Sequence, residues 1–312
     1  MTRGRGRRSM TRGKRGAAAL SIASNTVLIL LKIVVGAITG SIAIITEAVH
    51  SMIDLVASVI AYFSVRAADE PADAEHPYGH EKVENLAAAI EGMLILVGAA
   101  VIVYEATHQL VRGPAVERLG LGIAVMAFSV LANLVVSTVL YRQARKTESQ
   151  ALEGDAAHLR TDAMTSAGVL FGLLLVEITG NAVFDPITAL VVAVAIVWAG
   201  FRLLRRSSGI LVDEVLPDEE MDRIEAAIAH ARTPEVAGYH KLRARRAGSR
   251  RHIDFHAQYR SGTSLERAHE LAHLMRDAIE AEIPQSEVLI HVEPETSFRA
   301  PEDGGTGPYR AG

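Results

Sequence analysis

One histidine and one aspartate occur together twice in the chain with the same spacing. His50 stands four residues before Asp54, and His158 stands four residues before Asp162. Residues four apart lie on the same face of an α-helix, so each pair would point an imidazole and a carboxylate the same way. Imidazole nitrogens and carboxylate oxygens are ligands that zinc accepts. Two such helices facing each other would therefore supply a four-ligand site for a divalent metal.

The chain around these pairs is apolar. Of its 312 residues, 49% are hydrophobic and 22% are charged, and its mean hydropathy is +0.21, which is high for an ordinary soluble protein. Each pair lies in or beside a long apolar segment. Ionisable residues inside a membrane segment are costly, and by default they mark a substrate or ion pathway. The repeated pair therefore predicts a membrane transporter for a divalent metal, with zinc as the preferred ion.

Six segments are long enough to cross a hydrocarbon core of about 30 Å as helices of about twenty residues. They run over residues 17–38, 41–65, 83–104, 119–141, 157–179 and 183–204. The second and fifth segments carry the repeated pair. An even number of crossings puts both termini on one side of the membrane. The basic N-terminus and the Arg and Lys residues after the fourth and sixth segments make that side cytoplasmic.

Positive charge is concentrated at the start of the chain. Seven Arg and Lys residues fall between Arg3 and Arg15. We interpret residues 1–16 as a basic cytoplasmic segment next to the membrane, because a spanning segment follows at once; a nucleic-acid-binding arm is the less favoured alternative. We therefore expect the lipid bilayer, and no nucleic acid, as a partner. The chain has no cysteine, so any metal must be held by His, Asp and Glu.

The charges of the four predicted ligands suggest how transport would work. Two neutral imidazoles and two carboxylates balance the double charge of zinc, so the loaded site would be neutral. The empty site would leave two carboxylates uncompensated, and protonation would relieve that cost. Metal and protons would then compete for the same groups. This competition predicts exchange of cytosolic metal for protons by alternating access.

Other polar residues lie near the repeated pairs or within the predicted spans. Glu47 precedes His50 by three residues and shares its helix face. It could orient an imidazole by accepting a hydrogen bond from the ring nitrogen that does not bind the metal, or it could face a water-filled vestibule at a helix end. Asn25, Glu91 and Asn133 lie within predicted spans, and we expect them to form hydrogen bonds between helices.

Residues 207–296 have the pattern of a small cytosolic α/β domain. The predicted elements are a helix, two strands, a helix and a strand, at about 218–230, 239–245, 252–259, 264–281 and 288–292. Asp218 is the expected N-cap of the first helix. The αββαβ order predicts an open-faced sandwich of the metallochaperone or ferredoxin-like type, whose small core would gain from dimerisation. Residues 297–312 are rich in Gly and Pro, and we expect a disordered tail.

With these features the chain resembles the cation diffusion facilitator family, bacterial proton-coupled efflux transporters for zinc and related metals. The resemblance runs from Ala17 to Pro294. In that family the second and fifth transmembrane helices each supply two ligands to the transport site, and the matching residues are the two repeated pairs. The resemblance implies an α-helical membrane protein in the inner (cytoplasmic) membrane, with a six-helix transport domain at residues 17–206 and a homodimer as its assembly.

The resemblance also implies a second zinc site, in the loop between the second and third spans. The signature of this loop runs here from Pro71 to Lys82. Within it, Asp73, His76 and His80 would bind zinc.

A third zinc site is implied in the cytosolic domain, where the family holds two metals at a dimer interface. The matching residues are His240, His256, His269, His291 and Glu293. Glu293 stands where an Asp is common, and Val292 stands where some relatives have a further polar ligand, which leaves the number of metals open. Lys82 and Asp213 match positions that form a charge interlock between the membrane and cytosolic parts in relatives.

Two alternatives belong to other classes of function. His269-Glu270-x-x-His273 fits H-E-x-x-H, which in zinc proteases supplies two ligands and a catalytic base. This short motif is weak alone, and no third ligand follows at a recognised spacing. A membrane-anchored zinc sensor would keep the cytosolic histidines but would not need the pair twice within the membrane. The sequence therefore favours a transporter, which is not an enzyme.

Overall fold

The computed structural model describes residues 3–39, 42–112, 120–181 and 183–297. The chain divides into two compact units, Met1–Ser208 and Gly209–Gly312. We call them the helical unit and the C-terminal unit, and each is described by itself.

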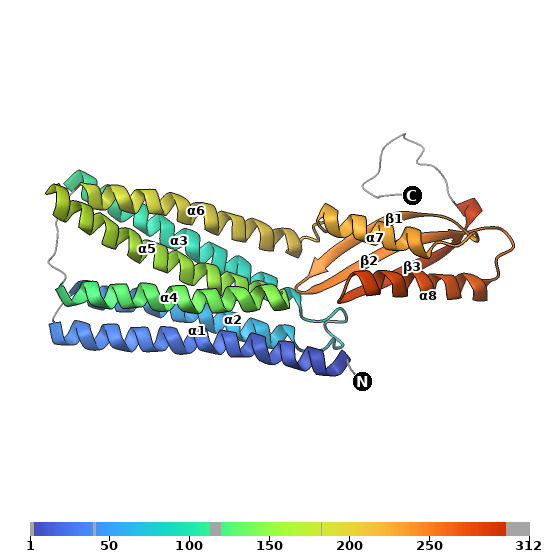
Figure 1. Cartoon of the computed structure of the whole chain (residues 1–312), viewed down its shortest axis with the longest axis horizontal. Coiled ribbons are helices and arrows are strands. Elements are labelled where there is room, and N and C mark those ends of the chain that lie inside the picture. The colour runs from blue at the N-terminus through green and yellow to red at the C-terminus, as the bar shows by residue number, and fades with distance from the viewer. Residues whose placement is uncertain (1–2, 40–41, 113–119, 182, 298–312) are drawn as a thin grey trace. The chain divides into compact units, whose positions relative to one another are not determined.

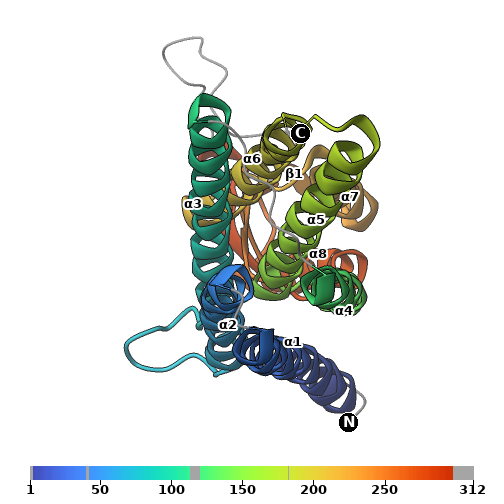
Figure 2. The same cartoon turned by 90° about the vertical axis from the view of Figure 1, so that its left-hand side faces the viewer.

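The helical unit consists of six long helices, drawn side by side in Figure 1. They are α1 Arg3–Thr39, α2 Ile42–Ala68, α3 Lys82–Arg112, α4 Gly120–Thr147, α5 Gln150–Thr179 and α6 Phe184–Leu211. Helix α5 packs against α2, α3 and α4, while α1 packs against α2 and α4; Figure 2 shows the same helices after a turn of 90°. The predicted six-helix architecture is confirmed.

Two of the helices begin well before the predicted spans. Helix α1 already starts at Arg3, so the basic segment ahead of the apolar residues is part of the helix. Helix α5 starts at Gln150 instead of residue 157, because the side chain of Ser149 caps it by accepting a hydrogen bond from the backbone N–H of Leu152. The second His and Asp pair therefore lies about two to three turns inside α5, and not at its start.

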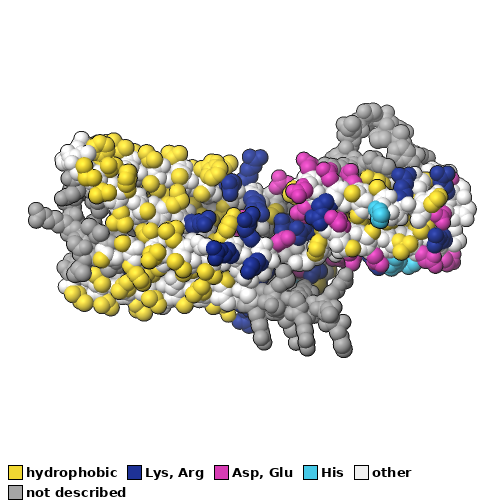
Figure 3. All heavy atoms as spheres, viewed as in Figure 1, with side chains coloured by type: hydrophobic (Ala, Val, Ile, Leu, Met, Phe, Trp, Pro, Cys, Tyr) yellow, Lys and Arg dark blue, Asp and Glu magenta, His cyan; other side chains and the backbone are white. Residues whose placement is uncertain are grey.

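The outer surface of the helical unit is apolar. In the described part of the chain, four helices contain segments long and apolar enough to cross a membrane: Gly13–Val35, Lys82–Arg112, Gln150–Val176 and Pro186–Leu211. The other two long helices, α2 and α4, include positions whose side chains lie outside the description. Figure 3 shows hydrophobic side chains over the visible face of the unit, with Lys and Arg gathered at one end. Large side chains such as Phe63 and Trp198 are more than half exposed, as expected for a surface in contact with lipid.

Small residues allow the helices of this unit to approach closely. A Cβ atom added to Gly92 of α3 would lie 3.0 Å from the backbone nitrogen of Leu204 on α6. A Cβ atom added to Gly154 of α5 would lie 3.2 Å from the Cα atom of Ala88 on α3. Close backbone approach at small residues is typical of helix packing in membranes. It brings the polar residues of α3 and α5 together in the interior.

The C-terminal unit has the predicted αββαβ order. Its elements are α7 Asp218–Ala231, β1 Val236–Ala247, β2 Arg250–Tyr259, α8 Leu265–Glu282 and β3 Ser286–Pro294, followed by a short 3₁₀ turn, Glu295–Ser297. Strand β2 lies in the middle of the sheet, antiparallel to β1 and parallel to β3. One prediction is wrong in detail: α7 begins at Asp218, and Pro217 takes the N-cap position without a side-chain hydrogen bond.

The alternation of side chains across the sheet separates a core face from a polar face. Buried side chains such as Ile253 and Phe255 of β2 pack in one cluster with Ile224 of α7 and with Met275 and Ile279 of α8. Alternate residues of the strands therefore point to the opposite face. The pairing register sets His240 opposite His256 and His256 opposite His291, so histidines from three strands meet on that face.

Candidate metal sites

Three of the four residues in the repeated pairs meet inside the helical unit. The Nε2 atom of His158 on α5 lies 3.2 Å from Oδ1 of Asp54 on α2 and 3.9 Å from Oδ2 of Asp162. One possible ligand atom from each residue lies within 4.8 Å of the other two. Ligand atoms at about 2.1 Å from a tetrahedral zinc ion would be about 3.4 Å apart. The donors therefore have the spacing that one ion requires, and we call these residues the Asp54 cluster.

The fourth predicted ligand, His50, lies one turn before Asp54 on α2. The side chains of His50 and Glu47 lie outside the described residues. Their predicted roles, as ligand and as orienting residue, stay predictions.

A buried hydrogen-bond network fixes α1 and α2 against α5 one turn from His158. The hydroxyl oxygens of Ser21 and Ser58 lie 3.1 and 3.0 Å from Oδ1 of Asp155. Asn25 donates to Ser58 at 2.9 Å, which confirms the interhelical hydrogen bond expected for Asn25. Sequence reasoning did not select Asp155 as a candidate, although it occupies the same place before His158 as Glu47 does before His50. That repeated acidic position was the available signal.

Glu91 differs from the expectation for it. Its side chain is fully buried on α3. In the part of the chain that the structure describes, neither of its carboxylate oxygens has a hydrogen-bond partner. The predicted interhelical hydrogen bond of Glu91 is therefore wrong. The surface of α5 that faces Glu91 carries Gly154, which has no side chain to offer a hydrogen bond.

The loop between α2 and α3 brings together Asp73, His76 and His80, which we call the loop cluster. Nδ1 of His76 and Nε2 of His80 lie 3.1 Å apart, and each lies 3.4 Å from an oxygen of Asp73. The backbone N–H groups of His76 and Glu75 donate to Oδ1 of Asp73. The bond from His76 is the main cause that lowers the pKa of Asp73. The carboxylate is thus held ionised beside two imidazoles, a donor set that suits zinc.

On the polar face of the sheet, Glu293 joins two histidines, and we call His240, His256 and Glu293 the sheet cluster. Nε2 of His240 lies 2.9 Å from one oxygen of Glu293, and Nδ1 of His256 lies 2.5 Å from the other. Burial acts to raise the pKa of Glu293, but the hydrogen bonds from the two histidines outweigh it and lower the pKa. His291 stands at the edge, 3.6 Å from Glu293 and largely exposed, while Val292 packs against the core.

The fifth residue predicted for this site, His269, lies elsewhere. It is on α8, where its Nε2 atom lies 3.0 Å from Nε2 of His273. Among the described residues, no third ligand completes a metal group with this pair. Glu270, the catalytic base of the protease alternative, is paired with Arg267 at 3.2 Å. Within one chain, His269 is therefore separate from the sheet cluster.

The predicted charge interlock would join the two units. Lys82 is the first residue of α3. Asp213 adopts a left-handed backbone conformation with φ of 61° and accepts a hydrogen bond from Arg245 at 3.0 Å within the C-terminal unit. The interlock of Lys82 with Asp213 stays a prediction.

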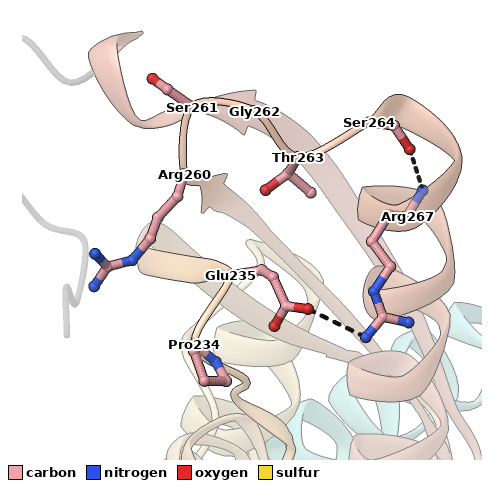
Figure 4. Close-up of a pocket in the computed structure, with 8 residues that line it drawn as sticks. All are labelled: Pro234, Glu235, Arg260, Ser261, Gly262, Thr263, Ser264 and Arg267. Atoms are coloured by element: carbon pink, nitrogen blue, oxygen red, sulfur yellow. Dashed lines mark hydrogen bonds and ion pairs between the residues drawn. The ribbon is translucent and has the colours of Figure 1, made fainter.

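A pocket of about 560 Å³ lies at the start of α8 in the C-terminal unit. Figure 4 shows Ser264 capping the helix and Arg267 paired with Glu235 across the pocket. Because these charged residues neutralise each other, we assign the pocket no ligand.

Comparison with known proteins shows the family. Residues 18–212 match the model of the cation efflux transmembrane domain, and residues 216–295 match that of the cation efflux protein, cytoplasmic domain. The chain is 34% identical over 277 residues to the uncharacterized transporter sll1263 of Synechocystis, with 89% of each chain covered. It is 32% identical over 288 residues to the cation-efflux pump FieF of Klebsiella pneumoniae, covering 92% of this chain and 95% of the pump.

A solved structure described as a putative zinc transporter CzrB in its zinc form is 36% identical to a part of the chain. It covers 28% of this chain and 99% of its own, with a TM-score of 0.27. The relatives matched over most of the chain are transporters, so the metalloprotease alternative is wrong. Their similarity over both units, together with the helices and the metal-ligand clusters described above, leads to one conclusion: the chain belongs to the cation diffusion facilitator family of cation efflux transporters.

Proposed function

We propose that the protein exports Zn²⁺ from the cytoplasm in exchange for protons. The observation that carries this proposal is the convergence of Asp54, His158 and Asp162 between α2 and α5 in a buried interior. The proposal includes His50 as the fourth ligand, from the matching position of the first pair.

The chemistry of the donors supports zinc over harder ions. A mixture of imidazole nitrogen and carboxylate oxygen suits zinc, whereas sites of oxygen alone suit magnesium, calcium or manganese. The short distances between the donor atoms leave room for one ion in tetrahedral geometry. The donor set therefore favours transfer of a zinc ion stripped of most of its water.

The burial of the cluster supports exchange for protons. Asp54 is 6% exposed and His158 is 5% exposed, so an empty and fully ionised site would leave carboxylates uncompensated in a medium of low dielectric constant. Protons that bind to the imidazoles or carboxylates would remove that cost, and imidazole titrates in the range of cellular pH gradients. Zinc that enters from the cytoplasm would displace these protons, and protons from the other side would displace zinc.

Two further parts of the proposal concern assembly and orientation. The loop cluster and the sheet cluster would bind zinc that stays with the protein, and the sheet cluster would do so in a homodimer. Exposed basic residues at the ends of α4 and α6, including Arg142, Arg145, Lys146 and Arg205, favour a cytoplasmic position for those ends. Both termini would then lie in the cytoplasm, with the protein in the inner membrane.

Flux in proteoliposomes tests the proposal. We expect zinc transport that accelerates when a pH gradient drives protons against the metal, and a parallel movement of protons that a trapped pH dye reports. Cadmium, manganese and iron(II) should compete only weakly with zinc for transport. Zinc flux that ignores the pH gradient would reject the proton exchange, and a preference for manganese or iron(II) would reject zinc as the substrate.

A further inference from the structure

A tyrosine near one end of the helical unit faces two arginines that come from different helices. The Cζ atoms of Arg160 on α5 and Arg145 on α4 lie 5.2 and 5.8 Å from the centroid of the Tyr141 ring. At such distances the face of an aromatic ring attracts a cation. The ring itself packs against a buried cluster that includes Leu159 of α5. It therefore holds both positive charges at one place, and we call Tyr141, Arg145 and Arg160 the Tyr141 cluster.

The two charges of the Tyr141 cluster are not neutralised within the described part of the chain. Arg145 and Arg160 are both exposed, and among the described residues neither has a carboxylate at ion-pair distance. Glu153, two turns before Arg160 on α5, pairs instead with Arg206 of α6 at 2.6 Å. Two positive charges that share one ring repel each other. An anion that contacts both would remove this repulsion.

The exposed surface next to the Tyr141 cluster is apolar. Going away from the turn that joins α4 to α5, Leu134 of α4 and Met164 of α5 are exposed. In the other direction α4 ends two residues after Arg145, and Figure 3 shows Lys and Arg gathered at that end of the unit. Arg160 starts deeper in α5, but its long side chain reaches the ring of Tyr141. The charges therefore lie where a lipid-facing surface meets a polar helix end, which is the depth of phospholipid headgroups.

We propose that the Tyr141 cluster binds the phosphate group of an anionic phospholipid, whose acyl chains lie along the exposed apolar side chains of α4 and α5. A guanidinium group is a planar fork of N–H donors that matches phosphate oxygens, and a phosphate diester has two charged oxygens, enough for both arginines. A zwitterionic headgroup adds a positive group, which the two arginines repel. The inference goes beyond the proposed exchange of zinc for protons and does not depend on it, because it requires only a helical unit that spans a membrane.

The bound lipid would join two helices of the transport domain. Arg145 belongs to α4, and Arg160 belongs to α5, which also carries His158 and Asp162 of the Asp54 cluster. A headgroup that contacts both arginines holds α4 against α5. A ligand that binds only the folded protein also raises its stability by mass action, so lipid binding can be followed by thermal unfolding.

Native mass spectrometry of the purified full-length protein tests the inference by counting molecules of dioleoylphosphatidylglycerol bound at rising lipid concentration. Arg145→Gln and Arg160→Gln should each weaken the tightest binding step by about tenfold or more, as expected for loss of a hydrogen bond between charged groups. Arg145→Lys keeps the charge but not the planar fork, and its affinity should fall between those of the unmutated protein and Arg145→Gln.

Arg142→Gln is the matched control, because Arg142 is exposed on the same helix but is not one of the arginines over the ring. It should weaken binding by no more than about fivefold, which is the general attraction of one basic residue to an anionic membrane surface. Equal effects of the three Gln substitutions would show that only the overall surface charge attracts the lipid, and would overturn the inference.

Two further ligands identify the source of the phosphate. Dioleoylphosphatidylcholine should bind more weakly than phosphatidylglycerol, and equal binding of the two lipids would overturn the inference. Inorganic phosphate in excess should not displace phosphatidylglycerol, because it has no acyl chains to contact the apolar surface; displacement would assign the site to a soluble anion instead.

Thermal unfolding in detergent gives an independent readout. Because Arg145 and Arg160 are exposed, their Gln variants should melt like the unmutated protein when no lipid is added. Phosphatidylglycerol should then raise the melting temperature of the unmutated protein more than that of either variant. An equal rise in all three proteins would contradict binding at the Tyr141 cluster.

Discussion

Buried carboxylates in the helical unit differ in what compensates their charge. Glu84 has the ammonium group of Lys14, Asp155 has two hydroxyl groups, and Asp54 has the imidazole of His158. Glu91 has none of these partners among the described residues.

A largely buried ion pair in the C-terminal unit, between Glu220 and Arg251, makes the stability of the protein depend on pH. Glu220 accepts hydrogen bonds from Arg251; burial acts to raise the pKa of Glu220, but these bonds outweigh it and lower the pKa. The pair therefore stabilises the fold above the pKa of a glutamate in the unfolded chain, about 4.3, and that stabilisation is lost as pH falls through the lower pKa of the folded state.

Glu220→Gln should accordingly lower the melting temperature of the C-terminal unit at pH 7, and the difference from the unmutated protein should vanish toward pH 3. Glu219→Gln is the matched control, since Glu219 is exposed in the same first turn of α7. Differential scanning calorimetry over this pH range measures both. Equal effects of the two substitutions at pH 7 would show that the ion pair contributes nothing beyond charge at a helix start.

The residues that sequence alone could identify are those whose spacing repeats. The His and Asp pairs at four-residue spacing predicted that the second and fifth spans would meet at His50, Asp54, His158 and Asp162. The structure brings the last three together, and the side chain of His50 lies outside the described residues. In the described part of the chain, Glu91 lacks the hydrogen bond expected for it, and the reason lies outside the local sequence. What a side chain contacts depends on residues far away in sequence, such as Gly154 opposite Glu91, and no local pattern records that contact.

Helix packing at small residues connects the elements to the site. Gly92 of α3 lies so close to the backbone of α6 at Leu204 that a methyl group would force the helices apart. Backbone atoms cannot move aside as a flexible side chain can. The separation of α3 from α6, and with it the position of Glu91 next to Gly92, therefore depends on a hydrogen atom at this position.

Gly92→Ala should destabilise the helical unit by about 1–3 kcal/mol through overpacking. Gly98→Ala is the control on the same helix, because nothing lies within 4 Å of its added Cβ atom, and it should stabilise the helix by up to about 1 kcal/mol. Thermal unfolding in detergent compares the two variants. If Gly92→Ala is as stable as Gly98→Ala, the close approach of α3 and α6 is wrong.

Element boundaries were harder to predict than element order. The αββαβ order follows from the change between two-residue and 3.6-residue periodicity, which is a property of the sequence itself. The start of α5 at Gln150 could not be read from apolar periodicity, because the first turns of that helix carry polar residues that the fold buries. Polar residues such as Gln150 and Asp155 are almost fully buried there, although hydropathy alone places them outside a span.

At the scale of the whole molecule, metal bound by the C-terminal unit should act on assembly. The sheet cluster holds ligands of one chain on a polar sheet face, and zinc shared across a homodimer would stabilise the associated state by mass action, by about 2.7 kcal/mol at a zinc concentration 100 times the dissociation constant. Sedimentation of the full-length protein in detergent should show more dimer with zinc. His256→Ala should remove this effect, while His230→Ala, an exposed histidine of α7, should not. A dimer fraction that is insensitive to zinc would contradict the proposed role of the sheet cluster.

The measurement that decides whether the Asp54 cluster is the transport site is zinc flux by Asp54→Asn and Asp162→Asn in proteoliposomes, beside the control Glu105→Gln, which changes an exposed glutamate of α3. Each Asn variant keeps the size of the side chain and removes one charged ligand. Substitutions of residues that only hydrogen-bond to a metal ligand lower metal affinity or activity about 10–100-fold. Loss of a ligand itself should therefore lower zinc flux at least that much, while both variants purify and unfold like the unmutated protein. Normal flux by either variant would contradict the assignment of the site.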